Sequence, residues 1–493
     1  MGDTKMSNRF DLAILGGGPG GYIAAERAGA RGKRVLLVER GPLGGVCLNE
    51  GCIPTKTLLH AAKTYQAALH GASVGVHVDG LTFGLADAMA WKKKVIETLR
   101  KGIASQMKRF GVTVVEGHGR LVGPGALAVD KTEYQADNIL LCTGSSSVVP
   151  PIPGADGPGV VTSGGLLEIE KMPESVVVVG GGYIGMEFAS FFSSVGAKVT
   201  VIEMMDEIIP FMDKDLAKLL RQSVKGVDYH LGSKVLGIEA AQGAGSAGGN
   251  GASDGGGQGA GTRSVVSFET AGKEGTSSVE GDVVLVAAGR RPNVENNGFE
   301  EAGLDVDRGG VTVDEFMKTN LPGVYAAGDV TGKSLLAHSA SRMGEVAVNT
   351  MFGTPGPAPE TPARYKDRMR YHAIPWVVFT APEVAGCGMT EQEAVEAGIE
   401  VESVSMSMKA SGRYLAEHPK ERGTIKAIVE KGSEKVLGVH MLGSGSSELI
   451  FGAAMMIETE LRGRDIREMI FPHPTVSEVL RDAMWEIDNE RRA

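Results

Sequence analysis

The sequence predicts an α/β protein with two Rossmann-like dinucleotide-binding domains followed by a smaller C-terminal α+β domain. Three observations lead to this prediction. The chain has 493 residues, which corresponds to about three domains of ~150 residues each. A strand–turn–helix–strand pattern occurs twice, and from Tyr371 onward the pattern changes to alternating strands and two helices.

Composition excludes several classes of protein. The formal charge is −10, so the chain has no basic field to hold nucleic acid or an anionic membrane. The run at 92–94, Lys-Lys-Lys, is typical of a solvated helix face. No apolar stretch approaches the ~20 residues of a membrane span, and the polar N-terminus lacks a signal-peptide core. Four cysteines do not make a secreted disulfide framework. We therefore expect a cytoplasmic protein.

The duplication is the strongest signal in the sequence. Residues 11–39 superpose on residues 175–203 when the numbering is shifted by 164. Each copy has a short apolar run, a G-x-G-x-x-G turn, a helical stretch and a second apolar run that ends in glutamate. The equivalent positions are Gly16 and Gly180, Gly18 and Gly182, Gly21 and Gly185, and Glu39 and Glu203.

Each position of this pattern has a physical role. The first glycine permits the tight turn, the second lets the backbone approach a pyrophosphate, and the third lets the helix pack closely on the strand. The helix N-terminus then presents N–H groups to the phosphates, and the acid ~20 residues later accepts from the ribose 2′-hydroxyl. Glu203 is followed by Met204 and Met205 rather than by arginines, which favours NAD(H) over NADP(H). The chain is therefore predicted to bind two dinucleotides.

Cys47 and Cys52 follow the first unit and have three interpretations. A structural zinc site needs two further ligands, and no second Cys/His pair with suitable spacing occurs. Two buried thiols that act as small hydrophobes are the second interpretation, and a redox disulfide is the third. Residues five apart in an ideal helix rise ~7.5 Å, beyond the Cα separation of a disulfide. A disulfide would therefore require a turn or a distorted helix here, which Gly51 permits.

Five motifs resemble those of the flavin-dependent pyridine-nucleotide disulfide oxidoreductases, in the order of that family. Residues 44–56, GGVCLNEGCIPTK, resemble the redox motif, and within the family they are most similar to the members that act on dihydrolipoyl groups. The other four are an A-T-G-S-like turn with Cys142 in the usual Ala position, a G-R-x-P-N motif, a second flavin motif and an H-P-T-x-x-E signature, at residues 141–145, 287–293, 324–330 and 472–478.

The resemblance assigns the first unit to FAD and the second to NAD. The residues it implies for FAD are Gly16, Gly18, Gly21, Glu39, Lys56, Gly119, Thr143, Gly144, Ser145, Asp329 and Ala337. Those it implies for NAD are Gly180, Gly182, Gly185, Glu203, Val235 and Gly289. No metal site is predicted.

The resemblance also implies a mechanism. Cys52 would lie against the flavin and Cys47 would exchange with substrate through its thiolate. His473 would take the thiol proton and Glu478 would orient its ring. Lys56 and Glu187 match positions that form an ion pair near the flavin. In the family the histidine reaches the cysteines of the other subunit, so a homodimer is expected.

The implied reaction oxidises a dihydrolipoyl group to the lipoyl disulfide and reduces NAD⁺ to NADH. The carrier would be a lipoyl domain of a 2-oxo-acid dehydrogenase complex or the glycine-cleavage carrier protein. The alternatives are a related disulfide or mercuric reductase and, from another class, a non-catalytic NADH-sensing flavoprotein. The tail has no cysteine pair of the mercuric reductase kind, and a sensor needs no base beside a disulfide.

Three departures from the family pattern stand out. Residues 336–344 resemble an A-H-K-A-x-x-E-G stretch but lack its Lys and Glu, and Phe471 replaces the first His of the common H-x-H-P-T version. Residues 240–261 contain 10 glycines in 22 residues, which predicts a disordered surface loop between two strands. Cys142 and Cys387 lie among small apolar residues and are predicted to be inert.

The predicted domains follow the family order. They are a first part of the FAD domain, the NAD domain with its Gly-rich insert at 240–261, a second part of the FAD domain, and a C-terminal dimerisation domain, at residues 1–155, 156–290, 291–364 and 365–493. Residues 86–109 are predicted to be a helix of the FAD domain. The strands expected in the C-terminal domain are Trp376–Thr380, Thr424–Glu430 and Leu437–Leu442.

Overall fold

The computed structural model describes residues 9–241, 263–353 and 367–492. The predicted disordered loop at 240–261 lies outside these residues except at its first two positions. The described chain forms two compact units. Unit 1 consists of the described residues within Met1–Thr57, Met89–Val148 and Gly289–Arg370, and unit 2 consists of those within Leu58–Ala88, Val149–Ala288 and Tyr371–Ala493.

Unit 1 is built on a seven-stranded sheet. Its strand order is β3-β2-β1-β6-β5-β4, and β19 pairs with the C-terminal half of β6. The strands β1, β2, β6 and β19 run parallel, and their residues are mostly buried, as in a sheet covered on both faces. The bounds are β1 (Arg9–Leu15), β2 (Val35–Glu39), β3 (Thr113–Glu116), β4 (Gly119–Gly123), β5 (Ala126–Val129), β6 (Thr132–Leu141) and β19 (Val324–Ala326).

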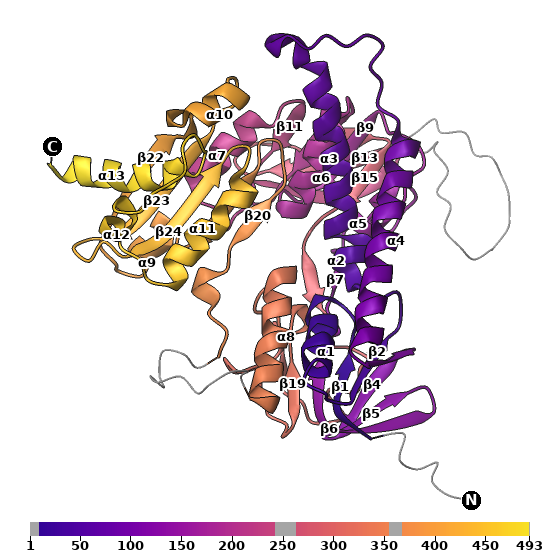
Figure 1. The fold of residues 1–493 in the computed structure, drawn as a ribbon. Helices are drawn as coiled ribbons and strands as arrows, with labels where there is room; N and C mark the ends of the chain where they lie inside the picture. Colours follow the sequence, from indigo (N-terminus) through magenta and orange to yellow (C-terminus); the bar gives the residue numbers. More distant parts are fainter. Residues whose placement is uncertain (1–8, 242–262, 354–366, 493) are drawn as a thin grey trace, which may run out of the picture. The chain divides into compact units, whose positions relative to one another are not determined.

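Three described α-helices lie wholly in this unit: α1 (Pro19–Gly29), α2 (Gly45–Glu50) and α8 (Ala337–Phe352). The unit also contains α4 (Leu85–Arg109) from Met89 onward and α3 (Cys52–Leu69) as far as Thr57, and the remaining residues of these two helices belong to unit 2. The helix predicted at 86–109 is confirmed as α4. Small residues let α1 and α8 lie side by side (Figure 1), since a Cβ on Gly344 would lie only 2.4 Å from the carbonyl oxygen of Gly20. Two short ladders and a 3-10 turn complete it: β7 (Ser145–Ser147) with β16 (Arg290–Pro292), β17 (Val306–Asp307) with β18 (Gly310–Val311), and η2 (Asp329–Thr331).

Unit 2 begins with a second parallel sheet, in the order β11-β10-β9-β15-β8. The predicted duplication is confirmed here, because β9, α6 and β10 repeat the arrangement of β1, α1 and β2. A three-stranded antiparallel sheet, β12-β13-β14, lies beside it, with the Gly-rich segment between β12 and β13. The elements are β8 (Val160–Val161), α5 (Ser163–Leu166), β9 (Ser175–Val179), α6 (Tyr183–Ser194), β10 (Lys198–Ile202), α7 (Lys214–Ser223), β11 (Val227–His230), β12 (Ser233–Ala240), β13 (Ser264–Thr270), β14 (Ser277–Gly281) and β15 (Val283–Val286).

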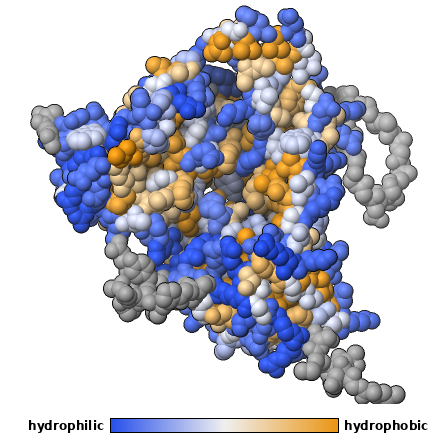
Figure 2. Space-filling model, in the orientation of Figure 1, coloured by the Kyte–Doolittle hydropathy of each residue, from blue (hydrophilic) through white to orange (hydrophobic). Residues whose placement is uncertain are grey.

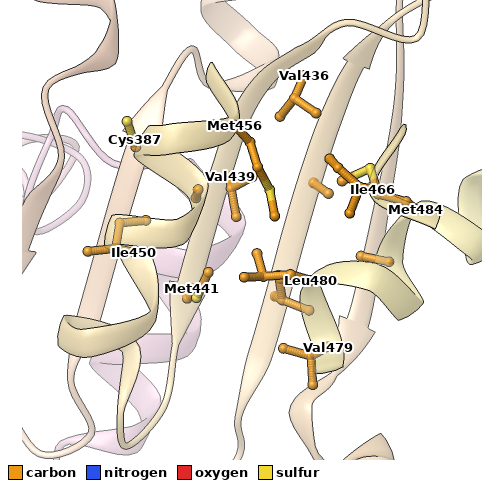
Figure 3. Close-up of a cluster of buried hydrophobic side chains, with 14 of the residues drawn as sticks. Cys387, Val436, Val439, Met441, Ile450, Met456, Ile466, Val479, Leu480 and Met484 are labelled. Atoms are coloured by element: carbon orange, nitrogen blue, oxygen red, sulfur yellow. The ribbon is translucent and has the colours of Figure 1, made fainter. Parts of the chain in front are cut away.

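The C-terminal part of unit 2 is an antiparallel sheet in the order β20-β21-β24-β23-β22. Helix α11 packs over β21 and β24, and α13 packs over β22 and β23, around one buried apolar cluster. Figure 3 shows part of this cluster, with Val439, Ile450 and Leu480 among its members. The elements are η3 (Tyr371–Ala373), β20 (Trp376–Val378), β21 (Val384–Gly388), α9 (Glu391–Glu396), β22 (Val401–Ser407), η4 (Met408–Ala410), α10 (Gly412–Glu417), β23 (Thr424–Glu430), β24 (Val436–Leu442), α11 (Ser446–Glu458), α12 (Gly463–Arg467) and α13 (Glu478–Arg492).

The α/β fold class and the α+β character of the last segment are confirmed. The strand Thr424–Glu430 has its predicted bounds, while β20 and β24 differ from the prediction by one or two residues. The boundaries at 155, 290 and 364 remain a proposal. Four apolar side chains are exposed at the end of α3 and just after it, where Figure 2 shows an orange patch: Leu69, Val74, Val76 and Val78.

Candidate functional site

The first glycine of each nucleotide turn occupies a conformation that only glycine adopts easily. Gly16 has φ +107° and Gly180 has φ +109°. A Cβ on Gly16 would lie 2.1 Å from the carbonyl oxygen of Cys142, and one on Gly180 would lie 2.5 Å from that of Ala287. The tight turn predicted from sequence is therefore present in both copies.

The second and third glycines of each turn differ in how much space surrounds them. A Cβ on Gly21 would lie 1.8 Å from the carbonyl oxygen of Gly16, and one on Gly185 would lie 2.0 Å from that of Gly180. These third glycines bring helix and strand together. By contrast, a Cβ on Gly182 would meet nothing within 4 Å, and one on Gly18 would have its nearest neighbour at 3.8 Å. The open space at the second glycine is where a pyrophosphate would approach the backbone.

The two glutamates bind the turns in the same manner. The carboxylate of Glu39 accepts from the N–H of Gly17 at 2.6 Å and of Gly41 at 2.9 Å. The carboxylate of Glu203 accepts from the N–H of Gly181 at 2.5 Å and of Met205 at 2.7 Å. The end of each second strand is thereby fixed to its glycine turn, and both cradles fit a dinucleotide.

A second flavin segment lies in unit 1 around Asp329. Ser145 Oγ donates to Asp329 Oδ2 at 2.5 Å, and Arg290 Nε donates to Ser145 Oγ at 2.8 Å. Burial raises the pKa of Asp329, and the Ser145 hydrogen bond opposes this shift. Thr143 Oγ1 donates to the carbonyl of Asn293 at 2.7 Å. The structure thus brings Thr143, Ser145 and Asp329 together in unit 1.

Sequence reasoning missed Arg290 and Asn293 as part of this segment. From this G-R-x-P-N motif the sequence assigns only Gly289 to a cofactor, NAD, whereas the structure pairs β16 with β7, the strand that contains Ser145. Asn293 also donates to the carbonyl of Thr143 at 2.9 Å. The motif itself was the signal, but the partner strand lies about 145 residues away and is not visible in the sequence.

The two cysteines lie on separate helices. Helix α2 contains Cys47, Gly51 interrupts the helical path with φ −144° and ψ −107°, and α3 begins at Cys52. Both thiols are half-buried. Two causes raise the pKa of the Cys47 thiol: the larger is a hydrogen bond with the Cys52 side chain, and the second is burial. The distorted helical segment predicted for the pair is confirmed, and the disulfide remains a prediction.

Lys56 and Glu187 are described in different units, so their predicted ion pair stays a prediction. Lys56 lies on α3, one turn after Cys52. Glu187 is a buried residue of α6, and its Oε1 accepts from the N–H of Phe379 at 3.0 Å. One turn further along α6, Ser190 Oγ accepts from the N–H of Ala381 at 2.9 Å. The C-terminal chain therefore fixes the face of α6 that contains Glu187.

His473 and Glu478 form the predicted pair at the start of α13. His473 Nδ1 lies 3.0 and 3.2 Å from the two carboxylate oxygens of Glu478. The histidine side chain is 78% exposed and the glutamate side chain 12% exposed. The pKa of Glu478 is lowered most by the hydrogen bond from the N–H of Thr475 and next by the hydrogen bond with the His473 ring. The positive charge of Arg481, whose Nη2 lies 3.8 Å from Glu478 Oε1, lowers it further. The carboxylate is thus held ionised against an accessible imidazole.

One further residue fixes this loop and was missed from the sequence. Ser411 is buried, donates from its hydroxyl to the carbonyl of Thr475 at 3.0 Å, and accepts from the N–H of Tyr414 as the N-cap of α10. A serine before a short helix is a common capping signal. Only the fold shows that its hydroxyl proton reaches the histidine loop.

The remaining predicted cofactor residues lie on different elements of the fold. Gly119 lies on β4, where a Cβ would meet Leu15 at 2.6 Å, and Ala337 begins α8. Val235 is a buried residue of β12, and Gly289 has φ +111° with open space around a Cβ. Their contacts with cofactors stay proposals. Among the residues that the structure describes, no group of three or more His, Cys, Asp or Glu could hold a metal ion, and no described helix is long and apolar enough to span a membrane.

Two family models match the chain in sequence order. Residues 10–344 match the pyridine nucleotide-disulphide oxidoreductase model, and residues 374–484 match the dimerisation domain of the same enzymes. The chain belongs to the pyridine nucleotide-disulphide oxidoreductases. This result confirms the resemblance drawn from the five motifs.

Several members of this family align with the chain over nearly its whole length. It is 36% identical to a mitochondrial dihydrolipoyl dehydrogenase of Pisum sativum, over 97% of this chain and 91% of that protein. It is 33% identical to a dihydrolipoyl dehydrogenase of Bacillus subtilis (strain 168), over 96% and 95%. A leghemoglobin reductase of Glycine max is 35% identical over 98% and 88%.

Solved structures of the family share the fold. The copper(II) complex of RclA, a flavoprotein disulfide reductase from Escherichia coli that HOCl induces, has a TM-score of 0.81. It is 28% identical and covers 97% of this chain and 99% of that one. Membership of this oxidoreductase family implies FAD and NAD(H) as the cofactors, and the dimerisation domain makes the protein a homodimer.

Proposed function

We propose that this protein oxidises dihydrolipoyl groups on a carrier protein to the lipoyl disulfide and reduces NAD⁺ to NADH. One observation carries the proposal: the thiols of Cys47 and Cys52 contact each other where α2 ends and α3 begins, directly after the first nucleotide unit. Relatives named dihydrolipoyl dehydrogenase, each at least 33% identical over nearly the full chain, support the choice of substrate.

The exchange of thiol and disulfide proceeds in two steps from the oxidised cysteine pair. A dihydrolipoyl thiolate attacks Cys47 Sγ, the Cys47–Cys52 bond breaks, and Cys52 leaves as a thiolate. The second lipoyl thiolate then attacks the mixed disulfide, so the lipoyl disulfide forms and Cys47 is released. Two electrons thus pass from substrate to the cysteine pair. FAD, which the first glycine turn and the Asp329 segment would hold, would supply the redox chemistry that couples the cysteine pair to NAD⁺.

His473 and Glu478 handle the protons of this exchange. The imidazole takes a proton from the substrate thiol, and the low-exposure carboxylate holds Nδ1, which leaves Nε2 to face the substrate. We propose that His473 serves the cysteines of the other subunit, so that each site needs both chains. Its high exposure in a single chain is compatible with this arrangement.

The partners and location follow from the chemistry. We propose as the carrier a lipoyl domain of a 2-oxo-acid dehydrogenase complex or the glycine-cleavage carrier protein. We also propose a cytoplasmic location, since a cysteine pair that cycles through the dithiol suits a reducing compartment. Some relatives are named as mitochondrial, so cell fractionation with a cytosolic marker tests the location.

The decisive experiment replaces one sulfur. Cys47→Ser should retain bound FAD but lose NADH-dependent reduction of lipoamide, because no mixed disulfide can form. Cys387→Ser is the matched control, since Cys387 is fully buried in the C-terminal core, and it should keep wild-type turnover. Turnover of glutathione disulfide or Hg²⁺ in place of lipoamide would indicate a related reductase, and a yellow protein with no turnover would indicate a sensor.

A further inference from the structure

Helix α8 contacts both segments that are predicted to hold FAD. Gly344 meets the backbone of Gly20, which lies on α1 between the second and third glycines of the first turn. Met343, the residue before it, is completely buried. Its sulfur contacts the turn that leads from β19 to Asp329. Two consecutive residues of α8 therefore touch the first and the second flavin motif.

The contact of Met343 is a hydrogen bond to the backbone. The N–H of Gly328 donates to Met343 Sδ at 3.2 Å. The Thr331 hydroxyl lies 4.0 Å from the same sulfur and donates to the carbonyl of Gly328 at 2.8 Å. A thioether is a weak acceptor, but a buried N–H without any acceptor costs more than a weak bond. Met343 therefore satisfies an amide that would otherwise be buried without a partner.

Gly328 is also held tightly on a second side. It has φ +81°, and a Cβ there would lie 3.1 Å from the Cβ of Ala340. Ala340 and Met343 lie three residues apart and so share one face of α8. The turn thus rests on this face of α8 through one close approach and one hydrogen bond.

The orientation of this turn decides where Asp329 points. Its carboxylate accepts from Ser145 Oγ at 2.5 Å, which keeps it in the second flavin segment. Because the Gly328 amide is adjacent in the chain, a shift of that amide would move the Asp329 carboxylate. In the stretch at 336–344, Met343 occupies the position that is Glu in the family pattern. The N–H of Gly328 therefore bonds to a neutral thioether, and no second carboxylate is placed at this position near Asp329.

We propose that Met343 is a positioning residue for FAD: its thioether accepts the Gly328 N–H and thereby fixes the Asp329 carboxylate in the flavin site. The proposal rests on the flavin site proposed above, and it does not depend on the identity of the disulfide substrate. Met343 itself need not touch the cofactor, because it acts through the turn.

The test measures the affinity of the full-length protein for FAD after removal and re-addition of the cofactor, followed by flavin fluorescence. Met343→Leu keeps the volume but removes the acceptor, and it should raise the dissociation constant of FAD about tenfold. Met107→Leu is the matched control, since Met107 is a buried methionine of α4, and it should stay within about twofold of wild type.

Two further variants keep the result interpretable. Met343→Gln offers an amide oxygen to the Gly328 N–H and should bind FAD within about threefold of wild type. If Met343→Leu cannot be purified, a tenfold loss in Met343→Gln overturns the proposal, and near-wild-type affinity supports it. Wild-type affinity in Met343→Leu also overturns it. Asp329→Ala should weaken FAD binding in either case. If that change has no effect, the flavin site itself is misassigned.

Discussion

The two nucleotide turns can be compared atom by atom. The glycine that precedes α1 has φ −74° and ψ −174°, and the one that precedes α6 has φ −70° and ψ −178°. Glu39 is the last residue of β2, and Glu203 directly follows β10. Each glutamate accepts two backbone N–H groups, one from the glycine turn and one from the residue two positions downstream. Within the turns, the copies have the same geometry.

Their surroundings differ in two ways. The buried face of α1 is made of small residues such as Ala24 and Ala28, which let α8 approach, whereas α6 buries Phe188, Phe191 and Phe192. After Glu39 the chain continues into α2 and α3, the helices that contain the two cysteines. After Glu203 it continues into Met204, whose residue surface is 66% exposed. The turn therefore specifies that a dinucleotide binds, and the surrounding residues specify which one and for what chemistry.

The largest expected effect comes from the same substitution made in each turn. Gly18 and Gly182 have extended backbone angles that any residue adopts, so valine fills the ligand space without straining the fold. Gly18→Val should give a colourless folded protein without FAD. Gly182→Val should stay yellow but fail to be reduced by NADH. Absorbance spectra and anaerobic NADH titration check both, and the opposite pattern would reverse the assignment of the two cofactors.

The next largest effect is on stability, and it compares the packing of α6 with that of α1. Phe191→Ala should lower the free energy of unfolding by ~3–5 kcal/mol, because it leaves a cavity in the core beneath α6. Ala25→Gly in α1 removes only a methyl group and should cost ~1 kcal/mol. Urea unfolding of the two variants measures the difference. Equal losses would show that the two helices depend on similar packing.

A smaller effect is expected on the choice between NAD(H) and NADP(H). Glu203→Ser removes the carboxylate that would repel a 2′-phosphate, so the preference of kcat/KM for NADH over NADPH should fall at least ~tenfold. Glu39→Ser should leave that preference unchanged and weaken FAD instead. Steady-state kinetics with both nucleotides decide. An unchanged preference in Glu203→Ser would place the discrimination at other residues.

The smallest effect is a pH dependence limited to the second unit. Asp282 accepts from the N–H groups of Glu174 and Ser175 at the start of β9. Burial opposes its ionisation, but Arg263 and the Ser175 N–H outweigh it and lower the pKa. A depressed folded-state pKa adds stability above the unfolded value near ~3.9, and this is lost as the pH falls through the folded value. Asp282→Asn should reduce stability at pH 7 by less than ~1 kcal/mol and flatten the acid limb of the unfolding curve. An unchanged acid limb would contradict this.

Local patterns in the sequence predicted most of the fold and the cores of both sites. The glycine turns, α4, β23 and the distorted cysteine segment follow from spacing, burial periodicity and glycine chemistry within about thirty residues. The His473–Glu478 pair is similarly local, since five residues and one short loop bring the side chains together.

The contacts that could not be predicted join distant segments. Arg290 reaches Ser145 only because β16 pairs with β7, and the N–H of Phe379 reaches Glu187 across nearly 200 residues. The bond from Gly328 to Met343 is local in sequence, but nothing in the sequence shows that a thioether rather than a carboxylate would satisfy this amide. In the last two cases a backbone N–H is one partner, and backbone groups leave no trace in residue identity.

The glutamate that ties each strand end to its glycine turn has a kinetic consequence. Because Glu39 and Glu203 already hold the turn amides, the cradle keeps its shape without a ligand. Incoming nucleotide then meets a turn that is already tied to its strand and needs no slow rearrangement of the loop. Capture of the cofactor by a newly folded chain would be limited by diffusion and desolvation rather than by ordering of the turn.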